Sequence, residues 1–271
     1  MAGPLLKEQL VKPRYNWKEL TEKLVKELNL TYEPVGVYLI PSVHAERYEQ
    51  FFRDIPRPKR KLTYCQAIYT VRGPGNYSGL PERPDILLMK AEDFLCSAGA
   101  ANLGFYDLPE AIKNGERDFL LRRFYSLESS KITRDMIPRL EPGSTSAIVV
   151  FKLSKAPVDP HVVLVFGTPA QIMALEGPYV MKEGGRIIAD LLGTCGVCAE
   201  MTVSPIINRK MNISLLCGGA RHHAFKDPTE MGAGIPGYKF PELVQNLLVR
   251  QKIPRRQDLP REEWDKFILK E

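Results

Sequence analysis

Apolar positions recur at helical spacing soon after the start of the chain. Asn16 directly precedes the first apolar residue of the repeat, and Glu19 lies three residues after Asn16. This is the arrangement of a capped helix N-terminus. The apolar stripe consists of Trp17, Leu20, Leu24, Val25 and Leu28. The pattern predicts an amphipathic helix that packs one face on a core.

A second helix start is predicted at Thr168-Pro169, where a capping residue precedes proline at the first helical position. This helix is expected to run to about Lys182 and to end at Gly184-Gly185. The remaining predicted helices lie at 44–52, in several stretches between 96 and 140, at 195–203 and at 240–249.

Short apolar runs predict the strands. They lie at 35–40, 86–89, 147–153, 161–166, 186–191 and 211–216, and the run 61–71 fits a strand or a helix. Strands and helices are intermixed without a regular βαβ rhythm, which favours a mixed sheet with helices over a doubly wound sheet. We expect an α+β fold with one compact domain over 1–253 and a C-terminal surface extension over 254–271.

Composition fits one folded domain. The 271 residues are 44% apolar and 26% charged, with a net charge of +6, which argues against a disordered chain. The longest uncharged run, about His161 to Leu175, is too short to cross a bilayer. Lys7, Glu8 and Lys12 leave no apolar stretch for a secretory signal. These features predict a cytoplasmic protein without a membrane partner, in which thiols stay reduced.

Basic side chains are densest in the runs Arg53–Lys61 and Arg250–Arg256. Neither run is interleaved with aromatic residues that could stack on bases, so a nucleic-acid partner is not expected. The runs fit a solvated loop and a solvated tail, or a surface for an anionic partner or a small anionic substrate.

The five cysteines carry the sharpest chemical pattern. Cys195 and Cys198 are separated by two residues, a spacing found in redox dithiols, zinc sites and iron–sulfur sites. A redox dithiol of the thioredoxin type needs a βαβ context, which this stretch lacks. The other cysteines are Cys65, Cys96 and Cys217.

Two metal sites compete on spacing alone. Cys195, Cys198, Cys217 and His222 have the spacing of a tetrahedral zinc site, but this set leaves Cys65 and Cys96 unused as small core residues. A cluster would use thiols that converge from several element ends. Spacing leaves the cluster, zinc and the absence of any metal open.

Several stretches of the chain resemble one known family, the domain of unknown function 169. They are 32–37, Tyr64-Cys65-Gln66-Ala67, Cys96-Ser97-Ala98-Gly99, 159–171, Cys198-Ala199-Glu200 and 217–221. The resemblance implies a shared site on Cys65, Cys96 and Cys198, joined by Cys217 in part of the family, with Cys195 more variable. It also implies an iron–sulfur cluster in proteins of anaerobes. The sequence Cys217-Gly-Gly-Ala-Arg221 departs from the family pattern by lacking an acidic residue.

Together these features predict a [4Fe–4S] protein of anaerobic metabolism with ligands Cys65, Cys96, Cys198 and Cys217, and with Cys195 able to replace one of them. An iron without a protein ligand would act as a Lewis acid in a lyase or hydratase reaction on a small anionic substrate. The expected catalytic residues are Glu200, Arg221 and His222. The alternatives are an electron carrier or accessory subunit with a partner redox protein, and a zinc-stabilised binding module. A homo-oligomer is compatible with each of them.

Overall fold

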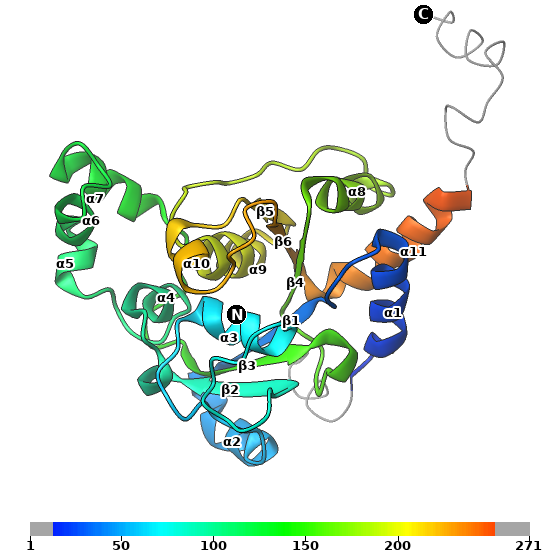
Figure 1. Ribbon diagram of the computed structural model, residues 1–271, viewed down its shortest axis with the longest axis horizontal. Helices are drawn as coiled ribbons and strands as arrows, with labels where there is room; N and C mark the ends of the chain where they lie inside the picture. Colours follow the sequence, from blue (N-terminus) through cyan, green and yellow to red (C-terminus); the bar gives the residue numbers. More distant parts are fainter. Residues whose placement is uncertain (1–12, 253–271) are drawn as a thin grey trace, which may run out of the picture.

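The computed structural model describes residues 13–252, and the expected extension at 254–271 lies outside them. A six-stranded sheet runs through the centre of the molecule in the order β2-β3-β1-β4-β6-β5, with every named pair antiparallel. The strands are β1 (Val35–Pro41), β2 (Ile86–Lys90), β3 (Thr145–Lys152), β4 (Val162–Gly167), β5 (Asn212–Ser214) and β6 (Met231–Pro236). The expected α+β class in a single domain is confirmed (Figure 1).

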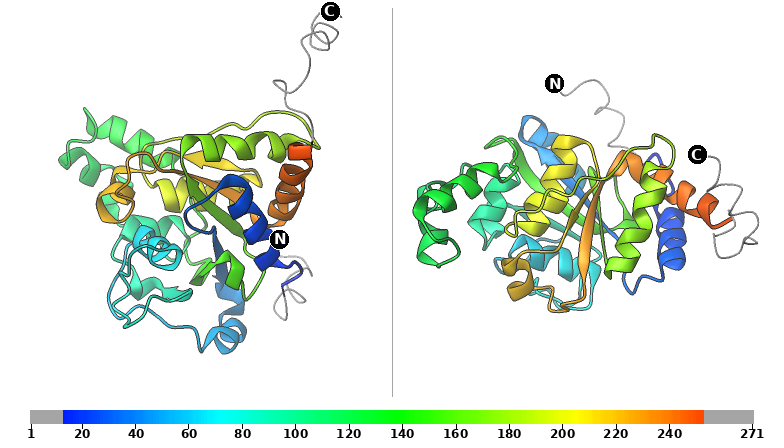
Figure 2. Two further views of the ribbon diagram at one scale, coloured as in Figure 1. Left: turned by 45° about the vertical axis from the view of Figure 1, so that its right-hand side comes forward. Right: turned by 90° about the horizontal axis from the view of Figure 1, so that it is seen from above.

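Side-chain alternation along the strands builds two cores, one on each face of the sheet. In β1, Val35, Val37 and Leu39 enter one core, whereas Tyr38 and Ile40 enter the other. The face that carries Tyr38 is covered by α1 (Trp17–Leu28), α2 (Ala45–Phe52), α8 (Pro169–Val180) and α11 (Phe240–Lys252). We call it the closed face. Figures 1 and 2 show α1, α8 and α11 side by side at one end of the molecule.

Shorter helices cover the opposite face, which we call the cysteine face. They are α3 (Tyr64–Arg72), α4 (Ser97–Asn102), a π-helix (Gly196–Val203), α9 (Ser204–Asn208) and α10 (Gly218–His223). The run 61–71, ambiguous by sequence, is therefore largely helix α3. The described residues also contain four 3-10 turns, at Ser42–His44, Ala91–Asp93, Leu153–Lys155 and Gly237–Lys239.

Three further helices form a lobe that projects from the cysteine face, away from α1 and α11 (Figures 1 and 2). They are α5 (Glu110–Lys113), α6 (Glu116–Leu120) and α7 (Leu127–Met136). Ile112 of the lobe packs with Ala98, Ala101 and Leu108 in a small core of its own. The lobe therefore has few apolar anchors to the rest of the molecule.

The predicted helix starts are confirmed in detail. The Asn16 side chain accepts the Glu19 N–H, and Thr168 and Gln171 form a reciprocal capping box at α8. The predicted strand at 186–191 is wrong, because this stretch has no regular structure. It is held instead by Asn212, whose side chain accepts from Asp190 N at 2.8 Å and donates to Asp190 O at 3.2 Å. Two side-chain bonds replace the ladder that a strand would need.

Membrane-spanning helices were sought among residues 13–252. None of the helices there combines the length and the apolar character that crossing a bilayer requires.

Candidate metal centre

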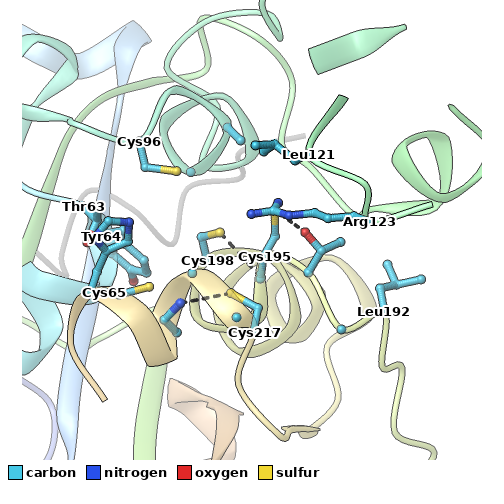
Figure 3. A pocket seen from close by; sticks show the side chains of 18 of the residues that line it. Thr63, Tyr64, Cys65, Cys96, Leu121, Arg123, Leu192, Cys195, Cys198 and Cys217 are labelled. Carbon is cyan, nitrogen blue, oxygen red and sulfur yellow. Dashed lines mark hydrogen bonds between the residues drawn. The ribbon is translucent and has the colours of Figure 1, made fainter. Parts of the chain in front are cut away.

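All five cysteines line one cavity of about 640 Å³ on the cysteine face. Cys65 lies in the first turn of α3, Cys96 caps α4, Cys195 and Cys198 open the π-helix, and Cys217 caps α10. Figure 3 shows these side chains reaching into the same space from separate elements. Residues up to about 150 positions apart in the chain are thus gathered at one place. The fold therefore brings all five thiols to one cavity.

Local structure fixes the thiol of Cys65 against the π-helix. Thr63 caps α3 by accepting the Gln66 N–H, while the Gln66 side chain accepts the Thr63 N–H. The buried hydroxyl of Tyr64 lies 3.0 Å from the Thr202 hydroxyl in the π-helix. The cap and this bond set where α3 begins relative to the helix that carries Cys198.

Glycines allow the π-helix to lie directly on the sheet and beside Cys217. A Cβ at Gly234 in β6 would be 1.8 Å from the carbonyl oxygen of Met201, so only glycine fits under the helix there. A Cβ at Gly196 would lie 2.8 Å from Cys217 N. Cys195 adopts a left-handed conformation with φ 56°, unusual for a residue other than glycine. The close packing brings Cys195, Cys198 and Cys217 to one edge of the cavity.

Each of three sulfur atoms accepts hydrogen bonds from the protein. Ala220 N–H donates to Cys217 Sγ at 3.4 Å, and Asn102 Nδ2 to Cys198 Sγ at 3.8 Å. Cys195 Sγ accepts from Arg134 Nη1 at 3.6 Å and from the Thr194 hydroxyl at 3.8 Å. Such donors stabilise thiolates over thiols, and they are what sulfur ligands of a metal need around them.

The thiols also perturb one another electrostatically. Burial raises the pKa of Cys65 well above its usual value, and the neighbouring thiols of Cys217, Cys96 and Cys195 raise it further. Burial raises the pKa of Cys96. The hydrogen bond between Cys195 and Cys198 raises the pKa of Cys198 and lowers that of Cys195. Burial adds to the rise at Cys198 and opposes the fall at Cys195. Mutual repulsion of this kind requires the five sulfurs to share one poorly solvated space.

The donors do not close on a single point. Among residues 13–252, no group of three or more His, Cys, Asp or Glu side chains is arranged around one metal ion. Four sulfurs around one zinc lie only about 3.8 Å apart, given a Zn–S bond of about 2.3 Å and tetrahedral geometry. The five thiols line a cavity of about 640 Å³, and His222 is not among the residues that line it.

Arginines of the lobe form the other side of the cavity. Arg117, Arg123 and Arg134 all line it, and each lies near the fully buried Asp118. Arg134 Nε and Arg123 Nη1 donate to separate Asp118 oxygens, the latter at 2.8 Å, while Arg117 Nη2 is 3.8 Å away. Figure 3 shows Leu121, Arg123 and Leu192 on the side away from Cys65. Nothing in the sequence singled out these arginines, because they lie among other basic residues in a stretch of short helices.

Glu200, predicted as a catalytic residue, is buried and holds the loop that borders the cavity. Its carboxylate accepts from Leu192 N at 2.7 Å, from Gly193 N at 3.2 Å and from the Ser214 hydroxyl. Burial raises the pKa of Glu200, and these bonds oppose the rise. The cavity is lined by Leu192 and Gly193, which Glu200 positions.

Arg221 and His222, also predicted as catalytic, do not line the cavity in the described part of the chain. Arg221 donates to the backbone carbonyls of Asp227, Leu215 and Glu230 and so fixes a loop. His222 is exposed, and its carbonyl accepts from Lys226. The neighbouring His223 lines the cavity instead, and burial lowers its pKa. A shift of one residue along a short helix decided which histidine faces the thiols.

Comparisons with known proteins agree with the resemblance seen in the sequence. The family model described as DUF169, "Uncharacterised ArCR", matches residues 23–246, a stretch that includes all five cysteines. An uncharacterized protein of Methanocaldococcus jannaschii is 28% identical over 231 residues, which are 85% of this chain and 93% of that protein. No solved structure matches. The chain therefore belongs to the domain of unknown function 169 family.

Proposed function

We propose that this protein binds a [4Fe–4S] cluster through Cys65, Cys96, Cys198 and Cys217, and that it is an enzyme of anaerobic metabolism acting on a small anionic substrate. The observation that carries the proposal is the convergence of five thiols from four helix starts on one cavity. Free thiols that can bind a cluster also fit a cytoplasmic location, where cysteines stay reduced.

The donor set favours a cluster over a single ion. All the converging ligands are sulfurs, which suit iron–sulfur clusters and zinc. Each cysteine of a four-iron cluster binds a different iron, so its sulfurs lie farther apart than those around one zinc. The five thiols reach the cavity from four separate elements, an arrangement that suits ligands bound to different irons.

Charge gives a second reason. Buried thiols that raise one another's pKa are poorly suited to ionise in the absence of a cation. A metal centre supplies the positive charge that makes several thiolates stable at one place. Hydrogen bonds to the sulfurs of Cys198 and Cys217 are already present to support them.

The cavity favours an enzyme over a closed carrier. It extends beyond the thiols to Arg117, Arg123 and Arg134, and its volume of about 640 Å³ lies in the range of small-ligand sites. With an iron left open to substrate, a bound cluster supplies a Lewis acid that polarises a hydroxyl or carbonyl oxygen. An iron would be open only when one of Cys65, Cys96, Cys198 and Cys217 does not bind, and Cys195 would be the thiol able to replace it.

His223 is the group we place in the proton-transfer role. It lines the cavity, and its lowered pKa keeps the imidazole neutral and basic near pH 7. In a hydratase or lyase reaction His223 would take the proton from carbon as the C–O bond breaks, and would then pass that proton to the departing hydroxide, which leaves as water. Hydration would run the same transfers in reverse. Glu200 keeps Leu192 and Gly193 in place at the cavity wall.

Anaerobic purification with iron, sulfide and zinc analysis tests the proposal. We expect brown protein with about four irons and four sulfides per chain. Cys198→Ala should lose most of the iron, because this buried thiol lies at the centre of the group. Cys195→Ala is the matched control from the same helix start, and it should keep at least half of the iron.

Two results would contradict the cluster. Colourless protein with one zinc per chain would support the zinc module, and full iron content in Cys198→Ala would show that this thiol is not a ligand. Greater iron loss in Cys195→Ala than in Cys65→Ala would make the assigned ligand set wrong.

A second candidate, an electron carrier, is favoured by the exposed apolar residues of the lobe. Leu120, Leu121, Tyr125, Ile132 and Met136 are all more than half exposed. Leu121 also lines the cavity, so an apolar docking face would lie beside the metal centre. Reversible one-electron reduction without any effect of small anions on the spectrum would favour the carrier.

A further inference from the structure

The cation cluster on the lobe holds more positive charge than its one acid neutralises. Asp118 is fully buried, and Arg117, Arg123 and Arg134 surround it. Arg134 also donates to Cys195 Sγ, whereas the ion-pair contacts of Arg117 and Arg123 within the described chain are with Asp118, so one carboxylate faces three guanidinium groups. A lobe stabilised by ion pairing alone would need fewer arginines.

The three arginines are not equivalent. Arg134 is buried and committed, because it pairs with Asp118 and donates to Cys195 Sγ. Arg123 donates to Asp118 with one nitrogen, and its side chain is 48% exposed. Arg117 makes only a distant 3.8 Å contact with Asp118.

Arg117 also carries an unsatisfied donor. Its Nε is buried and lacks a hydrogen-bond partner within the described chain, although the residue lines the cavity. A buried N–H without an acceptor is costly, and this Nε has no exposed surface through which a molecule in the cavity could reach it. The Arg117 side chain is 35% exposed, so an anion in the cavity would meet the exposed end of the guanidinium instead. The two terminal nitrogens of a guanidinium also present parallel N–H groups, which match the two oxygens of a carboxylate or phosphate.

We propose that Arg117 and Arg123 form an oxyanion subsite, which binds a carboxylate or phosphate group of the substrate on the lobe side of the cavity. The inference deepens the proposed function and rests on it only in taking this cavity as the reaction site. Arg117 gives the bidentate fork, Arg123 adds charge from the rim, and Asp118 with Arg134 holds both in place. The acidic end of the substrate is thereby anchored opposite the thiols.

Calorimetric titration of the anaerobically purified protein with sodium succinate and, separately, with inorganic phosphate tests the subsite. Arg117→Gln should weaken binding of the preferred anion about tenfold or more, since a charged bidentate contact is lost. Asp118 keeps its pairing with Arg123 and Arg134 in this variant, so the lobe should stay folded. Arg123→Gln should weaken binding less.

Arg122→Gln is the matched control. Arg122 is the neighbouring exposed arginine, and it is not among the described residues that line the cavity. Removing the same charge there should change the dissociation constant less than twofold. An equal loss in Arg122→Gln would mean that only general charge attracts the anion, and it would overturn the subsite. The subsite would also be overturned if wild-type protein bound neither anion at about 10 mM. This concentration lies above the roughly millimolar dissociation constants of weak small-ligand sites.

The two anions separate the ligand chemistries. Tighter succinate binding assigns a carboxylate, and tighter phosphate binding assigns a phosphate ester. Iron is measured in every sample, which separates the two proposals. Anion binding that depends on Arg117 in iron-free protein would keep the subsite while removing the cluster. Full iron content with no anion binding would do the reverse.

Discussion

The two faces of the sheet differ in the helices that cover them and in what those helices carry. On the closed face, α1, α8 and α11 have 12, 12 and 13 residues and bury bulky side chains such as Trp17 and Phe240 against the strands. On the cysteine face, α4, α10 and the π-helix have 6, 6 and 8 residues. Short helices place their first turns over the sheet, and those first turns or caps carry the cysteines.

The contrast teaches where stability and chemistry are separated in this fold. Because side chains alternate along the strands, both faces of the sheet carry apolar residues, so the sheet alone does not determine on which face the cavity forms. The helices that cover each face determine where the cavity forms. Long amphipathic helices fill the closed face, whereas helix starts and small residues leave an open space bordered by thiols on the other face. Perturbing each face in turn should therefore separate folding from metal binding.

The largest expected effect is on the closed face. Phe240 is fully buried, with its ring centroid 6.0 Å from that of Trp17. Phe240→Ala should lower the free energy of unfolding by about 4 kcal/mol, since it leaves a cavity in the core. Denaturant titration measures this loss, and iron per folded chain should not change. Loss of iron in proportion to stability would show that the two faces are coupled.

The next largest effect is expected on the cysteine face. Gly234→Ala places a methyl group 1.8 Å from the carbonyl oxygen of Met201, so the π-helix must move off β6. We expect a stability loss of about 3 kcal/mol, typical of overpacking. Iron content should fall as well, because the same helix carries Cys198.

Gly36→Ala is the control for that prediction. Its new methyl group meets the Phe151 ring at 2.1 Å on the closed face, so it also overpacks a strand. It should destabilise the protein yet keep full iron per folded chain. Equal iron contents in the two variants would refute the idea that the glycine at 234 positions the metal ligands.

The smallest effect concerns pH and the closed face. His161 stacks on Tyr38 with ring centroids 4.3 Å apart, and its Nδ1 accepts the Leu39 N–H at 3.1 Å. Burial lowers the pKa of His161 from 6.5 to about 4. The neutral form is thus favoured in the fold, so its contribution is full above pH 6.5 and is lost as pH falls toward 4.

Between pH 8 and pH 5 this histidine should account for about 2 kcal/mol of lost stability. Denaturant titrations of the wild type and of His161→Gln at both pH values measure how much of the lost stability comes from His161. The variant should be less stable at pH 8 and should lose about 2 kcal/mol less than the wild type on acidification. A parallel pH dependence in both proteins would show that His161 does not titrate in this range.

Local signals in the sequence predicted much of the fold. Asn16 and Thr168 act as helix caps where expected, because capping depends on a few adjacent residues. The stretch at 186–191 was wrongly expected to be a strand, although its apolar residues fit one. A strand needs a partner edge, and here the Asn212 side chain binds the backbone at Asp190 instead. Glu200 binds the next part of the loop, at Leu192.

The sequence by itself determined that five thiols exist, several of them next to small residues or the end of an element. The family resemblance pointed to four of them as a set. The tertiary structure alone decided that these thiols line one cavity, that His223 faces it instead of His222, and that three arginines of the lobe complete it. The physical reason is range. Caps and strands depend on neighbours in the chain, whereas a site depends on contacts between residues far apart in it, such as Met201 over Gly234.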